Sequence, residues 1–376
     1  MSESLAVESG QAQFGAGELV ETSVLERSFP REILSVVRKE GLFQLGEEYI
    51  AGKRELGRID ELIDLLMRSR ESQSAARQLR VMLYYLSDRF LNPQRGERAY
   101  NIGKVHYGLG NQLFERMLGE SMTYTCGYFC KTNSLDQAQY DKLDLCCRKL
   151  KLERGMKVLD IGCGWGNFAK FAAAKYGVTV HGVTVSERQA EFARNACKGL
   201  PVEIHLQDYR DIRGTYDRIV SIEMIEAVGR KNLPTYFDVV WRSLNPGGLF
   251  LLEVISAETV SSRSNRYFDS YLMWILKHIF PDGYLPTVTE LAEPCRQRFQ
   301  LEDWHSFGPD YDRTLMAWHE NFERAWDELH VDYGEKFRRI WKYYLLGCAG
   351  LFRSRTTHLY QILYSKGFGG RYGVER

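Results

Sequence analysis

Short apolar runs alternate with stretches of helical periodicity through the middle of this chain. The apolar runs predict strands at 157–161, 178–183, 202–206, 216–222 and 248–255, with helices between the first pairs. Such alternation is typical of a parallel, doubly wound α/β sheet. Residues 256–330 interrupt it with mostly helical, aromatic-rich sequence, and residues 335–376 return to helix and strand, which would close the sheet.

The flanking sequence predicts the domain organisation. Residues 1–17 are small and polar and predict a disordered tail. Residues 18–100 have helical periodicity and predict a small, mainly helical N-terminal domain. Residues 101–376 then form the α/β domain, in which a helical insertion at about 256–330 would cap the ligand crevice.

The first predicted strand ends in a glycine-rich turn, Val158-Leu-Asp-Ile-Gly-Cys-Gly-Trp-Gly166. Glycines allow a sharp turn and let a ligand lie against bare main chain. A dinucleotide fingerprint, Gly-x-Gly-x-x-Gly, would need a third glycine where this chain has Asn167. The form Asp-x-Gly-x-Gly-x-Gly suits S-adenosyl-L-methionine, which has no pyrophosphate for a helix N-terminus to bind. We therefore predict this cofactor, in contact with Asp160, Gly162 and Gly164.

The ends of the second and third strands supply further candidates, because ligands of open α/β sheets bind beyond the carboxyl ends of the strands. Thr184 and Gln189 can hold the ribose hydroxyls, a task more usual for an acidic residue, and Glu187 is a weaker candidate. Asp208 and Tyr209 can frame an adenine. A solvated loop is the alternative for this last pair.

The fourth and fifth strands carry carboxylates. Glu223 and Glu226 follow the fourth strand at a spacing that would place both on one helical face. Glu253 lies inside the apolar fifth strand, where an unpaired carboxylate would cost several kcal/mol. Desolvation would raise the pKa of Glu253 and make it a proton acceptor. The alternative is a carboxylate that only anchors a loop.

Composition narrows the class of protein. The net charge is +1, with 50 basic and 49 acidic residues, which argues against nucleic acid as a partner. The eight cysteines lack the spacing of a zinc site, so we predict no metal and a reducing, cytoplasmic environment. The first 17 residues lack the apolar core of a signal peptide, and the longest apolar stretch, 271–280, is too short to span a bilayer.

Several further motifs, in the same order, resemble the cyclopropane-fatty-acyl-phospholipid synthases. The similarity runs from about Arg98 to the C-terminus and extends more loosely over the N-terminal part. Its motifs, besides the glycine turn, are Lys104-Val-His-Tyr-Gly-Leu-Gly-Asn, Met122-Thr-Tyr-Thr-Cys-Gly-Tyr, Gln207-Asp-Tyr-Arg-Asp, Ile279-Phe-Pro-Asp-Gly, Glu302-Asp-Trp-His and Asp310-Tyr-Asp-Arg-Thr-Leu-Met-Ala-Trp.

The resemblance implies a class I methyltransferase domain, with a Rossmann-like doubly wound sheet, that adds a methylene from S-adenosylmethionine across a cis double bond of an unsaturated phospholipid acyl chain. The double bond attacks the methyl group, and loss of a proton from the resulting carbocation closes a three-membered ring. Family members hold a bicarbonate as the base. The resemblance places Cys126, Glu226, Ile255 (through its backbone) and Tyr311 in the bicarbonate cradle, and Tyr124, Thr125, Gly162, Gly164, Thr184 and Gln189 against the cofactor.

The family also implies peripheral contact with the inner face of the membrane, and its members often form homodimers, which nothing in this sequence tests.

Two departures from the family pattern affect the predicted base. Many members have a histidine where this chain has Ala227, and the bicarbonate-holding histidine of the fifth strand corresponds to Glu253. A carboxylate would repel bicarbonate at close range, which argues against that cofactor here. We hypothesise that Glu253 replaces bicarbonate as the base, or relays the proton, while Glu226 shares the proton or raises the pKa of Glu253.

Other functions remain open at this point. Proton loss from a different carbon would give a methylene- or methyl-branched lipid, and another alkene such as a sterol side chain is a possible acceptor. Related folds methylate amines, and Glu253 could hold an ammonium. A lipid-binding protein without catalysis is a different class, against which the intact glycine turn, Glu226, Cys126 and Tyr311 argue.

The aromatic residues of the predicted cap could have either of two roles. Their rings can stabilise a carbocation, or they can pack in an ordinary core, which we expect for most of them. The residues are Tyr267, Phe268, Tyr271, Trp274, Phe280 and Tyr284.

Overall fold

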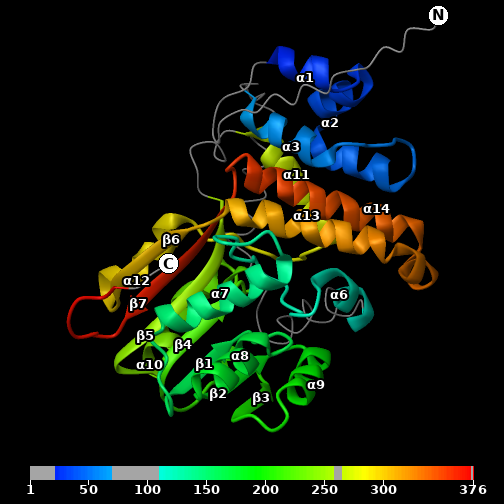
Figure 1. The fold of residues 1–376 in the computed structure, drawn as a ribbon. Helices are drawn as coiled ribbons and strands as arrows, with labels where there is room; N and C mark the ends of the chain where they lie inside the picture. Colours follow the sequence, from blue (N-terminus) through cyan, green and yellow to red (C-terminus); the bar gives the residue numbers. More distant parts are fainter. Residues whose placement is uncertain (1–21, 70–109, 258–264, 374–375) are drawn as a thin grey trace, which may run out of the picture.

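The computed structural model describes residues 22–69, 110–257, 265–373 and 376 (Figure 1). The predicted tail at 1–17, the N-terminal domain beyond residue 69 and most of the motif that begins at Lys104 lie outside these residues. The domain boundary at about residue 100 therefore stays a prediction.

A seven-stranded sheet in the order β3-β2-β1-β4-β5-β7-β6 forms the centre of the α/β part. All its strands run parallel except β7, which is antiparallel to both β5 and β6. The sheet is therefore mixed, whereas the sequence pattern predicted a parallel one. The strands are β1 (Lys157–Ile161), β2 (Thr179–Thr184), β3 (Val202–Leu206), β4 (Tyr216–Ile222), β5 (Leu244–Ser256), β6 (Gln300–Ser306) and β7 (His358–Ser365).

The edge strand β6 is an element that the sequence did not predict inside the mostly helical interval 256–330. It lies inside that interval and pairs with β7 along one side only. Its sequence, Gln-Leu-Glu-Asp-Trp-His-Ser, is polar, and most of its residues are partly or fully exposed. An edge strand of this kind lacks the apolar signal that marks the interior strands.

Helices cover both faces of the sheet (Figure 1). On one face, α7 (Leu135–Lys149) and α8 (Asn167–Tyr176) pack against apolar residues of the interior strands, and on the other α10 (Leu233–Ser243) and α12 (Val288–Gln297) do so. Helix α9 (Glu187–Ala196) lies beside β2 and β3. Alternate residues of β5 serve the two faces: Leu249 and Leu251 face α7 and α8, while Phe250 and Leu252 face α10.

A second helical layer lies above the sheet in Figure 1 and shares one hydrophobic cluster. It comprises α1 (Thr22–Ser28), α2 (Arg31–Ile50), α3 (Ile59–Arg68), α6 (Asn111–Leu118), α11 (Arg266–His278), α13 (Pro309–Arg324) and α14 (Trp326–Arg353). Most of the aromatic residues of the predicted cap are part of this core. The ring centroid of Trp274 lies 4.7 Å from that of Tyr343, and the Tyr271 hydroxyl donates to the Tyr343 carbonyl. These rings stabilise the helical layer by packing.

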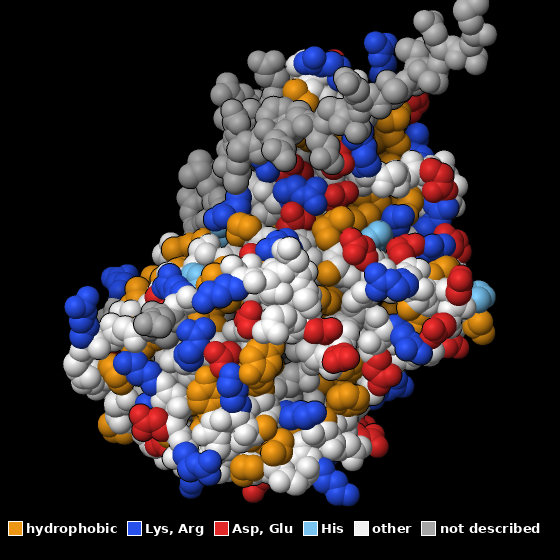
Figure 2. Space-filling model, in the orientation of Figure 1, with side chains coloured by type: hydrophobic (Ala, Val, Ile, Leu, Met, Phe, Trp, Pro, Cys, Tyr) orange, Lys and Arg blue, Asp and Glu red, His pale blue; other side chains and the backbone are white. Residues whose placement is uncertain are grey.

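The face of the molecule drawn in Figure 2 shows no dominant charge. In Figure 2, Lys and Arg side chains are interspersed with Asp and Glu over the visible face. Among the helices that the structure describes, none combines the length and apolar character needed to cross a membrane.

Candidate active site

The glycine turn joins β1 to α8 with three residues in the left-handed region. Gly162, Gly164 and Gly166 have φ of +83°, +53° and +84°, values that favour glycine. A side chain at Gly162 would also bring its Cβ within 2.7 Å of the Cβ of Met224. The N–H of Gly162 donates to the Val183 carbonyl at 2.9 Å, which ties the turn to the end of β2.

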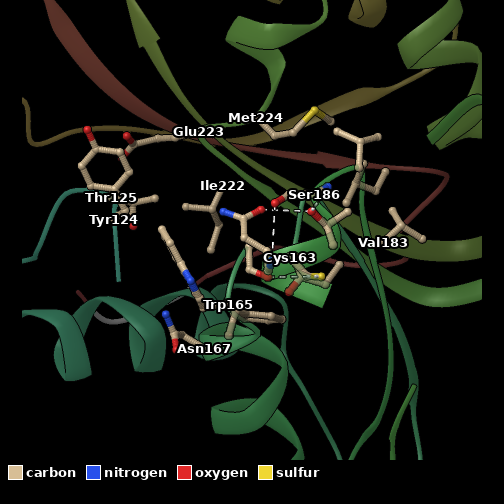
Figure 3. A pocket seen from close by; sticks show the side chains of 18 of the residues that line it. Tyr124, Thr125, Cys163, Trp165, Asn167, Val183, Ser186, Ile222, Glu223 and Met224 are labelled. Atoms are coloured by element: carbon tan, nitrogen blue, oxygen red, sulfur yellow. Dashed lines mark hydrogen bonds between the residues drawn. The ribbon is translucent and has the colours of Figure 1, made fainter. Parts of the chain in front are cut away.

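A pocket opens at the carboxyl ends of β1, β2 and β4, beside this turn (Figure 3). Figure 3 shows Tyr124, Thr125 and Glu223 towards one end of it and Val183 and Ser186 towards the other. The exposed Glu187 is not among the lining residues. The pocket brings together all nine residues that the sequence assigned to the cofactor: Tyr124, Thr125, Asp160, Gly162, Gly164, Thr184, Gln189, Asp208 and Tyr209.

The side chains near β2 and β3 are held in place by one another. The Thr184 hydroxyl donates to the Gln189 carboxamide oxygen at 3.1 Å, and both residues are buried. The Asp208 carboxylate accepts two hydrogen bonds from the Arg210 guanidinium, at 2.7 and 2.8 Å. The adenine and ribose contacts predicted for these residues remain predictions.

Asp160 ends β1 as a nearly fully buried carboxylate. Burial raises its pKa to about 7, an effect that Lys142 partly opposes. One carboxylate oxygen, Oδ2, has no hydrogen-bond partner among the residues that the structure describes. A ligand with a positively charged or N–H donor group beside the glycine turn would satisfy this oxygen, and the ammonium of S-adenosylmethionine is such a group.

Replacing Asp160 with asparagine is expected to stabilise the ligand-free protein at neutral pH. Because the pKa in the folded protein, about 7, lies above the usual 3.8, stability falls as pH rises through this window. The gain from Asp160→Asn should therefore grow from about pH 4 to about pH 7 in thermal melts and level off above that range. Affinity for S-adenosylmethionine should fall roughly 10- to 100-fold, as expected for a lost charged hydrogen bond.

The exposed Asp211, next to the same pocket, provides the control. Asp211→Asn should change neither property. A pH-independent gain in melting temperature for Asp160→Asn would contradict the assigned cause.

Comparison with known proteins identifies the family. Residues 94–362 match the family described as mycolic acid cyclopropane synthetase. The chain belongs to this family. Cyclopropane-fatty-acyl-phospholipid synthase of Escherichia coli (strain K12) is 45% identical over 331 residues, which cover 88% of this chain and 85% of the relative.

Two other relatives extend this comparison. Tuberculostearic acid methyltransferase UfaA1 of Mycobacterium tuberculosis is 33% identical over 349 residues, covering 88% of this chain and 81% of the relative. The crystal structure of mycolic acid cyclopropane synthase CmaA1 complexed with SAH and CTAB is 29% identical, with a TM-score of 0.68 over 71% of this chain and 98% of that one.

These findings confirm the resemblance drawn from the sequence. They also confirm the class I methyltransferase fold and S-adenosylmethionine as the methyl donor of this enzyme.

Glu223 is a residue of the site that the sequence pointed to as a carboxylate after the fourth strand but to which it assigned no role. It directly follows β4 and lines the pocket. One carboxylate oxygen accepts the backbone N–H of Cys126 at 2.9 Å, and the other accepts the Tyr311 hydroxyl at 2.6 Å. Its backbone φ of +48° is uncommon for a residue with a side chain, a kind of strain that often accompanies functional sites. The available sequence signal was its position one residue past a strand that ends at the crevice.

Glu226 points elsewhere, which corrects the prediction that it shares a helical face with Glu223. It lies in a one-turn 3₁₀ helix, Ile225–Ala227, and its carboxylate accepts the backbone N–H of Ile255 at 2.6 Å. Burial raises the pKa of Glu226 to about 7, although the hydrogen bond from Ile255 lowers it. The Ile255 N–H predicted for an anion cradle is thus bonded to Glu226.

Glu253 is fully buried beneath α7 and is not among the residues that line the pocket. The alternation of β5 places its side chain on the same face as Leu249 and Leu251. One carboxylate oxygen lies 3.5 Å from the Lys142 ammonium, which is also fully buried, and the other accepts the Gln361 amide at 2.6 Å. Gln361 is its register partner on β7. The sequence predicted a proton acceptor at this strand position, but the carboxylate is directed towards a buried cation.

The structure thus divides the five predicted catalytic residues into three groups. Cys126 and Tyr311 meet at Glu223, whereas Glu226 with Ile255, and Glu253 with Lys142, form separate contacts. Within the described ranges, no group of three or more His, Cys, Asp or Glu residues is arranged to hold a metal ion.

Proposed function

We propose that this enzyme converts cis double bonds in the acyl chains of unsaturated phospholipids to cyclopropane rings. The observation that carries the proposal is the 45% identity to a cyclopropane-fatty-acyl-phospholipid synthase over nearly the whole of both chains. The pocket supports it, because all the predicted cofactor contacts converge at one edge of the sheet.

The chain's own residues supply binding, orientation and charge stabilisation. When bound, S-adenosylmethionine provides an electrophilic methyl group to which a carbon–carbon double bond can add. Tyr124 lines the pocket, and its hydroxyl lies 2.7 Å from that of Tyr344. Its ring centroid is 5.1 Å from that of Trp318. We propose that this aromatic group faces the carbocation, since ring faces attract positive charge.

The proposed substrate also requires access to a membrane surface, because phospholipid acyl chains lie within the bilayer. We propose peripheral contact from the cytoplasmic side, and a homodimer as the assembly. Flotation of the enzyme with phospholipid vesicles and its mass in solution would test these two statements separately.

A methyl- or methylene-branched product is the second candidate. Glu253 is a carboxylate where the family pattern has a histidine. Glu223 is a further carboxylate, and it lines the pocket. A shift in the position of the proton acceptor would change which carbon loses its proton. The 33% identity to a tuberculostearic acid methyltransferase favours keeping this product open.

Expression of the chain in bacteria that lack their own cyclopropane synthase should yield phospholipid acyl chains that are heavier by one CH2 group. Mass spectrometry detects this gain, and proton NMR distinguishes a ring from a methylene or methyl branch. A chain that binds S-adenosylmethionine in a titration but leaves the lipids unchanged would contradict the proposal. No binding in that titration would favour a lipid-binding protein without catalysis.

A further inference from the structure

We propose that the carboxylate of Glu223 is the proton acceptor of the reaction and replaces an external base such as bicarbonate. This inference rests on the proposed function, because it concerns the proton lost when the ring closes. It differs from the sequence hypothesis, which assigned that task to Glu253.

Glu223 occupies the hydrogen-bond donors that a bound anion would need. The Cys126 N–H and the Tyr311 hydroxyl, both predicted to cradle bicarbonate, instead donate to the two oxygens of Glu223. The Ile255 N–H, a third predicted donor, is bonded to Glu226. A bicarbonate at this place would lack these hydrogen bonds and would lie against a carboxylate. The residues present therefore do not fit that anion.

The position of Glu223 in the pocket also suits a proton acceptor. Glu223 lines the cofactor pocket together with Tyr124 and Thr125, and Figure 3 shows the three towards the same end of it. Glu226 and Glu253 are not among the lining residues. Of the other acidic residues that line it, Asp160 lies beside the glycine turn and Asp208 is paired with Arg210. Glu223 is therefore the carboxylate placed beside the aromatic end of the pocket.

Burial and the charged groups around Glu223 also make its carboxylate more basic. Burial raises its pKa well above the usual value, and the nearby Glu253 and Glu226 raise it further. Lys142 and the hydrogen bond from Tyr311 oppose this rise. The sulfonium charge of a bound methyl donor would also favour the anion. A carboxylate tuned in this way takes up a proton more readily than an exposed one.

In the proposed step, methyl transfer to the double bond precedes proton loss and ring closure. The π electron pair of the double bond forms a bond to the methyl carbon, and the carbon–sulfur bond breaks with its electron pair left on sulfur. The positive charge then lies on the second alkene carbon. Glu223 removes a proton from the transferred methyl group, and the released C–H electron pair closes the ring. Because the base must be ionised, turnover should rise with pH through the raised pKa of Glu223.

In this arrangement Glu253 is a positioning residue. Its contact with Lys142 neutralises a buried ammonium that also bonds to the Thr125 hydroxyl of the pocket wall. The Lys142–Glu253 pair therefore holds Thr125 in place and balances the charge near Glu223.

The test compares three forms of the enzyme in bicarbonate-depleted buffer, with unsaturated phospholipid vesicles as substrate. The wild type should be active without bicarbonate. Glu223→Gln should lower kcat by about 10²- to 10⁴-fold, the range for loss of a general base. Its affinity for S-adenosylmethionine should stay within a few-fold of the wild type, which shows that the pocket is intact.

Glu223→Gly provides chemical rescue. Glycine suits a φ of +48°, and removal of the side chain frees the Cys126 N–H and the Tyr311 hydroxyl for a small anion. Added bicarbonate or formate should restore activity to Glu223→Gly but not to Glu223→Gln, whose side chain still fills the site.

Three outcomes would overturn parts of the proposal, and they can be told apart. A wild type that depends on added bicarbonate, or a Glu223→Gln variant within tenfold of wild-type turnover, would overturn the role of Glu223 alone. A wild type that binds S-adenosylmethionine but never transfers a methyl carbon to lipid would overturn the proposed function itself.

Discussion

Replacing Gly162 with alanine is expected to abolish methyl transfer and to weaken S-adenosylmethionine binding by more than about 100-fold. Two costs add at this position. The φ of +83° is unfavourable for any residue with a side chain, by roughly 1–2 kcal/mol. The new Cβ would also lie 2.7 Å from the Cβ of Met224, so either the turn or the end of β4 must move. Calorimetric titration with S-adenosylmethionine measures the loss directly.

Gly155 separates the two costs. Its φ of +87° is nearly the same, but nothing lies within 4 Å of the Cβ that alanine would add there. Gly155→Ala should therefore lower stability by only the backbone cost and leave cofactor affinity unchanged. Equal affinity losses in the two variants would mean that distortion of the pocket by Met224 is not the cause.

Replacing Lys142 with methionine is expected to destabilise the fold by about 3–5 kcal/mol, the usual cost of leaving a buried charge unpaired. Lys142 and Glu253 are both fully buried, and the ammonium is the cation that faces the carboxylate. Although burial disfavours the ammonium, the carboxylates of Glu253 and Glu223 favour it, and the pKa of Lys142 is above its usual value. Without it, Glu253 would retain, among contacts with the described residues, only the hydrogen bond from Gln361. Denaturant unfolding measures the change.

The double variant Lys142→Met with Glu253→Gln is the decisive comparison. With both charges removed, most of the lost stability should return, because a neutral pair in a buried site is often as stable as an ion pair. Lys175→Met is the matched surface control: its ammonium also contacts a carboxylate, Asp144, but its side chain is 41% exposed. It should cost less than about 1 kcal/mol. A Lys142→Met variant as stable as the control would show that the contact between Lys142 and Glu253 does not stabilise the fold.

The same elements explain where prediction from sequence succeeded. Strands β1, β3 and β4 have the predicted bounds. The interior strands β1 and β4 contain apolar runs, as buried strands do, whereas the edge strand β3 alternates apolar and polar residues. Strand β6 was missed because its polar residues lie at an edge. Most of the cofactor residues were predictable because they lie at or just after a strand end in the sequence, and a parallel sheet gathers such ends at one edge. Tyr124 and Thr125 precede the first strand, and only the family resemblance pointed to them.

The proton acceptor could not be predicted in this way. From the sequence, Glu253 stood out as a carboxylate in an apolar strand, but which face of the sheet it would occupy, and that Lys142 would meet it there, depends on how α7 packs on β5. Glu223 drew less attention because its role depends on the Cys126 and Tyr311 donors, which lie 97 and 88 residues away in the chain.

The sequence by itself therefore determined the fold class, the family and the methyl donor, because these depend on short-range patterns: apolar periodicity, a glycine turn and motifs in a fixed order. Only the tertiary structure decided which carboxylate faces the pocket. That choice depends on hydrogen bonds between distant segments and on the burial of charge, neither of which is present until the helical layer and the sheet have packed together.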